Sequence, residues 1–122
     1  MKAQKFSIRN RARSFQYAFS GLYRFLSTTH NAIIHAGATV VVIAVAVVIK
    51  LPLEKFLFVL AAIGMVWVAE LFNTAIEHIC DMISPQFHPR IKIIKDLSAA
   101  AVLVAALVAV VTACIIFIPA FL

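Results

Sequence analysis

Residues 69–81 read Ala-Glu-Leu-Phe-Asn-Thr-Ala-Ile-Glu-His-Ile-Cys-Asp, and they directly follow a long stretch without charged residues. Glu70, Asn73 and Glu77 lie three and four residues apart in this segment, and Asp81 ends it. An α-helix places side chains with this spacing on one face. A carboxylate in the bilayer costs about 2.5–3.5 kcal/mol on insertion scales, so we expect this polar face to serve a function.

The composition around this segment is that of an integral membrane protein. Of 122 residues, 64% are hydrophobic and 13% are charged, whereas a soluble domain is about half apolar and about a quarter charged. The hydrophobic residues gather in three runs, each close to the roughly 20 residues that cross a bilayer as a helix. Three such helices cannot enclose a large core, so we expect subunits to share helix faces in an oligomer.

The net charge of +6 does not indicate a nucleic-acid partner. Six of the eleven basic residues precede the first apolar run, where they suit anionic lipid headgroups. The two cysteines have neither metal-site nor disulfide spacing. We therefore expect this chain to bind a membrane and no nucleic acid.

The pattern of apolar residues predicts four helices. In the first, Phe15, Phe19 and Leu22 recur at helical spacing among basic residues, which favours an amphipathic helix in the membrane interface over a disordered basic tail. The other three are apolar and long enough to span the membrane. We thus predict an all-α fold in one domain, residues 1–122, with a surface helix over 6–27 and transmembrane helices over 32–49, 55–79 and 97–118.

Polar and proline-containing segments separate these helices. Residues 27–31 are expected to form a polar junction, and residues 84–90, bracketed by prolines, a loop. Pro119 is expected to end the last helix. A row of small residues, four apart, allows close approach of helix backbones in the third span: Ala101, Ala105, Ala109 and Ala113.

Lysine and arginine are distributed unevenly outside the spans. The N-terminal segment has six, the loop between the second and third spans has three, the first loop has two and the C-terminus has none. The positive-inside rule therefore predicts a cytoplasmic N-terminus and a cytoplasmic second loop. Four of the five acidic residues then lie near the cytoplasmic surface.

The polar face suits the chemistry of phosphates. Carboxylates and an amide favour Mg²⁺, which takes oxygen ligands and commonly bridges to phosphates. Lys95, next to Asp96, can neutralise phosphate charge, and Glu70, the deepest carboxylate, can act as a general base. Phosphoryl transfer to a lipid alcohol and a path for protons or cations are both open at this point. The sequence has no Walker-type motif and no protein-kinase catalytic loop.

The same residues resemble a known family. The string Glu-x-x-Asn-Thr-Ala-Ile-Glu at 70–77, followed by Asp81, residues 84–88 and the pair Lys95 and Asp96, is similar to the prokaryotic diacylglycerol kinases, which include undecaprenol kinases. The resemblance covers nearly the whole chain. It implies a homotrimer of three-span subunits with a surface helix, located in the bacterial inner membrane, with active sites shared between neighbouring subunits.

The resemblance also implies roles for individual residues. Glu70 would be the catalytic base, and Glu77 would bind the Mg²⁺ that accompanies ATP. The nucleotide and phosphate region would be lined by Tyr17 from the surface helix and by Asn73, Glu77, Asp81, Gln86, His88, Lys95 and Asp96.

The start of the first span departs from the family pattern. The family has a glutamate that shares the metal with the position of Glu77, and Thr29 occupies that position here. A basic residue common in the family is replaced by Ile33. Because Thr29 offers only a neutral oxygen, we expect a metal site of Glu77 and Thr29 to bind Mg²⁺ more weakly.

Plainer roles are open for the same polar residues. Acids and amides in membrane proteins also form hydrogen bonds between helices, and charged side chains near helix ends also contact headgroups. Histidines at a membrane surface are more often interface residues than ligands. These alternatives apply to Glu70, Asn73 and Glu77 (hydrogen bonding), to Asp81, Asp96 and Lys95 (headgroup contact), and to His30, His35 and His88 (interface or loop).

The sequence therefore predicts an enzyme, an ATP- and Mg²⁺-dependent kinase of a membrane lipid alcohol such as diacylglycerol or undecaprenol. One alternative, suggested by Thr29, is a weakened or inactive family member with a structural or lipid-binding role. Another is a proton or cation conductor that uses Glu70. A conductor needs a polar path across the membrane, and residues 56–69 offer none.

Overall fold

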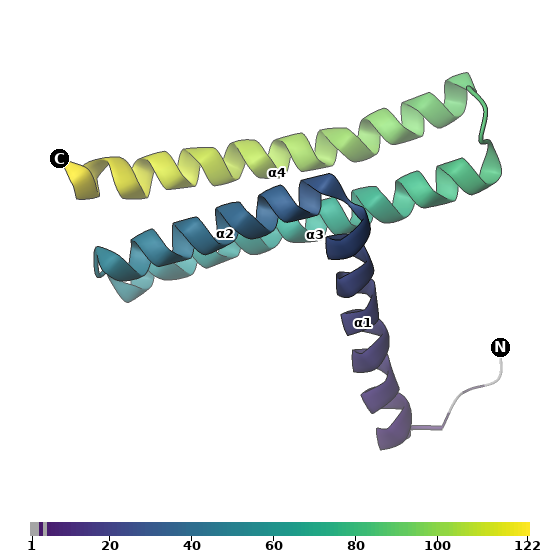
Figure 1. The fold of residues 1–122 in the computed structure, drawn as a ribbon, viewed down its shortest axis with the longest axis horizontal. Coiled ribbons are helices and arrows are strands. Elements are labelled where there is room, and N and C mark those ends of the chain that lie inside the picture. Colours follow the sequence, from purple (N-terminus) through teal and green to yellow (C-terminus); the bar gives the residue numbers. More distant parts are fainter. Residues whose placement is uncertain (1–2, 4) are drawn as a thin grey trace. The chain divides into compact units, whose positions relative to one another are not determined.

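The structure is a computed structural model that describes residue 3 and residues 5–122. All regular structure in these residues is helical, which confirms the predicted all-α class. The four helices are α1 (Ile8–Thr28), α2 (His30–Val48), α3 (Leu53–Ile83) and α4 (Pro89–Phe121) (Figure 1). The chain divides into two compact units, Met1–Ile34 and His35–Leu122, which are described separately.

The N-terminal unit contains α1 and the first turn of α2. Ser7 caps α1, where its Oγ accepts a hydrogen bond from a backbone N–H of the first turn at 3.4 Å. Phe15 and Phe19 lie on one stripe of the helix and are exposed, whereas the spacing places Arg13 on the other side. α1 is therefore amphipathic, as predicted, and suits a membrane–water interface.

A single residue, Thr29, separates α1 from α2. Its backbone is extended, with φ −116° and ψ 121°. Its N–H donates to the carbonyl of Phe25 at 3.2 Å, and its carbonyl accepts from the N–H of Ala32 at 3.2 Å. The predicted junction over residues 27–31 is therefore wrong in length, because the helices are joined by one residue whose backbone bonds to the last turn of α1 and the first turn of α2.

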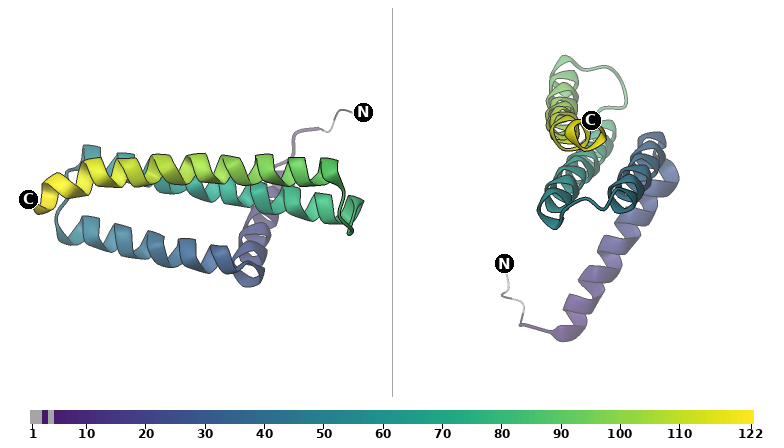
Figure 2. Two further views of the ribbon diagram at one scale, coloured as in Figure 1. Left: turned by 90° about the horizontal axis from the view of Figure 1, so that it is seen from above. Right: turned by 90° about the vertical axis from the view of Figure 1, so that its left-hand side faces the viewer.

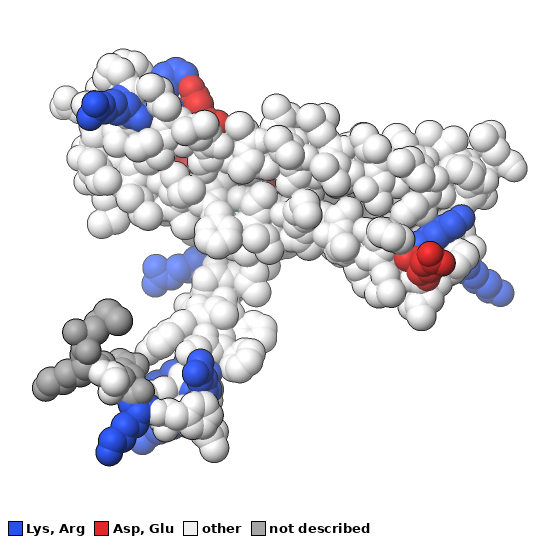
Figure 3. All heavy atoms as spheres, turned by 180° about the vertical axis from the view of Figure 1, so that it is seen from behind, with Lys and Arg blue, Asp and Glu red and all other residues white. Residues whose placement is uncertain are grey.

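The second unit is built from α2, α3 and α4, each long and apolar enough to cross a membrane. On the face shown in Figure 3, most of the charged side chains of this unit lie at the two ends of its helices, and small areas of acidic atoms lie between them. Most apolar side chains are exposed, as in a protein that lipid surrounds. The buried hydrophobic residues of this unit are Ala46, Val59, Val66, Cys80, Ala105 and Ile116.

α2 ends in a tight cap that reverses the chain into α3. Lys50 has a positive φ of 54°, and the N–H of Leu51 donates to the carbonyl of Ala46 at 3.0 Å, as in a Schellman motif. Pro52 precedes the first residue of α3 and cannot continue α2. α3 then extends beyond residues 55–79 at both ends, because the helix continues into the polar segments that flank its apolar run.

α4 begins earlier and ends later than the sequence predicts. Pro89 is its first residue, and His88 caps it by accepting a hydrogen bond from the N–H of Arg90 on Nδ1 at 3.2 Å. Proline is tolerated there because a helix start does not need its missing N–H. The predicted loop over 84–90 is thus too long. The helix also continues through Pro119, because a proline in the last turn removes one i→i−4 hydrogen bond and few residues remain after it to be disrupted.

α3 and α4 run antiparallel and pack side by side (Figures 1 and 2). Ala105 on α4 is buried with 5% of its surface exposed, and Ala109 and Ala113 of the same row are half-buried. Ala101 is exposed. Small side chains thus bring α4 close to its neighbour along the central part of the predicted row.

We expect Ala105→Leu to destabilise the protein by about 1–3 kcal/mol, because the added side chain overpacks the contact between α3 and α4. Thermal unfolding in detergent micelles measures the effect. Ala100→Leu makes the same change at an exposed position of α4 and should stay within about 0.5 kcal/mol of the parent. Equal unfolding temperatures for the two variants would show that α4 does not pack through Ala105.

Candidate functional site

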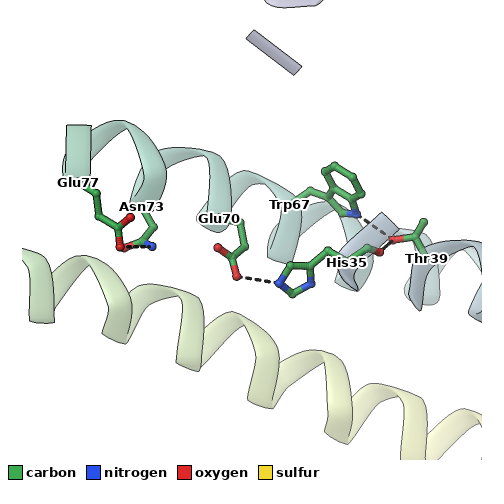
Figure 4. Close-up of polar contacts among 6 residues, drawn as sticks. All are labelled: His35, Thr39, Trp67, Glu70, Asn73 and Glu77. Carbon is green, nitrogen blue, oxygen red and sulfur yellow. Dashed lines mark hydrogen bonds and ion pairs between the residues drawn. The ribbon is translucent and has the colours of Figure 1, made fainter. Parts of the chain in front are cut away.

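Glu70 is the buried acid at the centre of the candidate site. It is 4% exposed, and it is the one buried charged residue within the part of the chain that the structure describes. Its Oε1 lies 2.7 Å from Nε2 of His35 on α2 (Figure 4). An ionisable side chain in an apolar helix is retained where it has a partner and a use. The position of Glu70 therefore fits the predicted functional face.

A second polar contact joins α2 to α3 one turn away. Trp67 donates from Nε1 to Oγ1 of Thr39 at 2.9 Å, and Thr39 donates to the backbone carbonyl of His35 at 2.7 Å (Figure 4). An apolar cavity of about 300 Å³ lies beside these residues and is lined by all three helices of the unit. The polar contacts between α2 and α3 are therefore grouped at the edge of this cavity.

Asn73 and Glu77 continue the polar face along α3. Asn73 donates from Nδ2 to Glu77 Oε1 at 3.3 Å, and its Oδ1 accepts from Oγ of Ser98 on α4 at 2.6 Å. Ser98 is buried, Asn73 is half-buried and Glu77 is exposed. The polar face thus extends from the buried Glu70 to the exposed Glu77. The hydrogen bond between Asn73 and Ser98 connects it to α4.

Charged pairs lie where α3 ends and α4 begins. Lys95 Nζ lies 2.6 Å from Oδ1 of Asp81, and Lys92 pairs with Asp96 one turn along α4. These side chains are largely exposed, so the pairs contribute little to stability. They place two cations beside the acidic face.

A hollow of about 280 Å³ lies between the α3–α4 loop and the start of α4. Gln86 and His88 line it from the loop, and Lys92 and Lys95 line it from α4. Ammonium groups and an amide can bind phosphate oxygens through charge-assisted and ordinary hydrogen bonds. His88 also has a structural role, because its Nδ1 caps α4.

Eight of the ten predicted site residues belong to the second unit, and the other two, Tyr17 and Thr29, belong to the N-terminal unit. Tyr17 is exposed on α1 and Thr29 is half-buried. Among the described residues, no three His, Cys, Asp or Glu side chains are grouped to hold a metal ion.

Sequence reasoning overlooked Lys92 and Ser98 and treated His35 as an interface residue. Ser98 follows Lys95 by three residues and so shares its helix face, which was a usable signal. His35 is an ionisable residue one turn inside an apolar helix, and such a residue calls for a partner. Interhelical hydrogen bonding, considered above as a plain role for Glu70, does occur.

The chain is similar to known proteins over most of its length. Residues 16–117 match the family model described as prokaryotic diacylglycerol kinase. The chain is 34% identical to undecaprenol kinase of Bacillus subtilis over 107 residues, 88% of this chain and 87% of that protein. It is 32% identical to diacylglycerol kinase of Escherichia coli over 101 residues, 81% of each chain. It is also 34% identical to diacylglycerol kinase of Synechocystis, over 89% of this chain and 63% of that protein.

Three apolar helices and these matches define a multi-pass membrane protein of the lipid kinase class. The chain belongs to the prokaryotic diacylglycerol kinase family, whose members phosphorylate diacylglycerol or undecaprenol. This confirms the resemblance that the sequence carries in residues 70–96.

We expect Ser98→Ala to destabilise the protein by about 1 kcal/mol, because it removes the hydrogen bond that ties Asn73 to α4. Thr112→Val is the matched control, since the Thr112 hydroxyl donates only within α4, to the carbonyl of Val108. Thermal unfolding in detergent compares the two. The same loss in both variants would contradict a specific role for the Ser98–Asn73 hydrogen bond.

Proposed function

We propose that this chain transfers the γ-phosphoryl group of MgATP to the hydroxyl of a membrane lipid alcohol, diacylglycerol or undecaprenol. In this proposal the reaction takes place at the cytoplasmic face of the bacterial inner membrane. Glu70 accepts the proton of the lipid hydroxyl as the hydroxyl oxygen attacks the γ-phosphorus. The bond from that phosphorus to ADP then breaks, and ADP keeps the electron pair.

The observation that carries this proposal is the burial of Glu70 at one end of a polar face. A base for a lipid alcohol must lie at the depth of the lipid hydroxyl, and Glu70 is a buried residue in the apolar part of α3. Glu77, two turns along the same helix, is exposed. The face thus connects a lipid-side group to a water-side group over seven residues, or roughly 10 Å of helix.

The exposed end of this face supplies groups suited to MgATP. Glu77, with Thr29, would hold the Mg²⁺ of MgATP through side-chain oxygen atoms, and the ion would offset phosphate charge. Lys92 and Lys95, with Gln86 in the same hollow, suit the phosphate oxygens. Asp81 holds Lys95 through the 2.6 Å contact and thereby orients its ammonium. In this proposal Asn73, His88, Asp96 and Tyr17 complete the nucleotide region.

The proposal includes a homotrimer with sites shared between subunits. The helices of one subunit leave most of their apolar side chains exposed, and neighbouring subunits as well as lipid would cover them. Tyr17 and Thr29 would then complete a site from the N-terminal unit. The distribution of basic residues supports a cytoplasmic N-terminus and a cytoplasmic α3–α4 loop.

A second candidate function rests on Thr29. The family glutamate that shares the metal is absent, so a weakened or inactive member with a structural or lipid-binding role is the alternative. Activity of the parent chain toward lipid alcohols separates the two.

Glu70→Gln tests the assigned base. We expect the parent chain to phosphorylate at least one of diacylglycerol and undecaprenol in mixed micelles, and the variant to lose about 10²–10⁴-fold in turnover, because it cannot accept the proton. Transfer of radiolabelled phosphate from ATP to each lipid measures this and also identifies the acceptor.

Glu54→Gln is the matched control, because Glu54 is an exposed carboxylate at the opposite end of the same helix. It should keep the parent rate. Unchanged turnover in Glu70→Gln would end the assignment of Glu70, and a parent chain inactive on every lipid would favour the alternative function.

Thr29→Glu tests the departure from the family pattern. We expect it to lower the Mg²⁺ concentration needed for half-maximal phosphorylation, because a second carboxylate adds a charge–charge attraction that threonine lacks. Glu77→Ala in the same background should remove the gain, since both residues would act on one ion. A Mg²⁺ titration of lipid phosphorylation compares the single and double variants.

Thr28→Glu is the control, because it places the same charge one residue earlier, at an exposed position of α1. It should leave the titration where the parent has it. If Thr29→Glu also leaves it unmoved, Thr29 does not face the metal.

A further inference from the structure

Glu70 is the proposed base, but the contact that half-buried His35 makes with it has no role in the reaction described so far. Glu70 Oε1 and His35 Nε2 lie 2.7 Å apart, and within the described chain this is the one hydrogen bond of the Glu70 side chain. The side chain of Glu70 is 6% exposed, and that of His35 is 26% exposed. Little water can therefore reach the Glu70 carboxylate to take the place of His35 as its hydrogen-bond partner.

The contact occupies only one of the two carboxylate oxygens. When Glu70 is ionised it can only accept, so His35 donates from Nε2 and holds Oε1. The second oxygen, Oε2, then keeps a defined direction, because a carboxylate is planar and its first oxygen is fixed. A defined direction matters for a base, since misplacement of a reacting group by about 1 Å can cost about 10²-fold in rate.

His35 itself comes from a different helix than Glu70. α2 carries His35, and α3 carries Glu70, so the direction of the carboxylate depends on how these helices pack. The contact between Thr39 and Trp67 joins the same two helices one turn away. The direction of the Glu70 carboxylate thus depends on a residue of α2, which lies outside the polar face of α3.

We propose that His35 is a positioning residue for Glu70, which holds Oε1 so that Oε2 receives the proton of the lipid alcohol. This rests on the proposed function. His35 donates one hydrogen bond throughout and exchanges no proton with the lipid. The proton passes from the lipid hydroxyl to Oε2 while the oxygen–phosphorus bond forms and the bond to ADP breaks.

The test compares two replacements of His35 by steady-state lipid phosphorylation. His35→Leu removes the donor at similar size, and His35→Gln keeps an N–H donor the same number of bonds from Cβ. We expect kcat to fall about 10²-fold in His35→Leu and to be largely restored in His35→Gln. KM for ATP should stay at the parent value in both, because His35 is not among the residues proposed to bind the ATP phosphates.

Two further variants separate positioning from simple packing. Thr39→Val removes the hydrogen bond that Trp67 of α3 donates to α2 and should keep kcat near the parent value. His35→Leu combined with Glu70→Gln should be no slower than Glu70→Gln alone, because the two residues would act as one unit. Equal losses in Thr39→Val and His35→Leu, or additive losses in the double variant, would overturn the proposal.

A spectroscopic measurement keeps the pair testable apart from activity. In protein labelled with ¹⁵N-histidine, the Nε2 signal of His35, assigned by its absence in His35→Gln, should shift in Glu70→Gln. An unmoved signal would overturn the pairing, whatever the activity.

A parent chain without lipid phosphorylation would overturn the proposed function, and a shifted signal would then leave His35 and Glu70 as a structural pair only. Parent activity with full rate in His35→Leu would overturn the positioning role alone.

Discussion

The constraint on which this structure depends is the cost of an ionisable carboxylate in an apolar helix. Glu70 can stay buried because His35 supplies a hydrogen bond from the neighbouring helix at 2.7 Å. Without such a partner, a charge at this depth would favour exposure or neutralisation. The requirement links α2 to α3 at one level of the helices, and His35, the partner of Glu70, also lines the apolar cavity.

The polar groups are arranged by their distance from the ends of the helices. Glu70 is buried, Asn73 is half-buried and holds a hydrogen bond to Ser98 on α4, and Glu77 is exposed. Lysines with their acidic partners follow at the loop end. Such a graded face suits the proposed reaction between a lipid hydroxyl and a nucleotide phosphate, because one reactant is confined to lipid and the other to water.

Stability and function draw on different contacts in this chain. α3 and α4 pack closely through small side chains such as Ala105, which contributes van der Waals contact without polar groups. The contacts between α2 and α3 near the site are instead polar, from His35 and Thr39. Packing of α4 therefore holds the α3–α4 hairpin together, and in our proposal the hydrogen bond from His35 alone sets the direction of the Glu70 carboxylate.

The sequence by itself determined the helical class, the three apolar spans, the amphipathic α1 and the polar face from Glu70 to Asp81, because each follows from local periodicity and composition. It missed the start of α4 at Pro89, since a capping histidine and a proline at the first position look like a loop. Only the tertiary structure paired Glu70 with His35 and Asn73 with Ser98. These partners lie 35 and 25 residues apart, and helix packing, which spacing along one helix does not encode, decides which side chains meet.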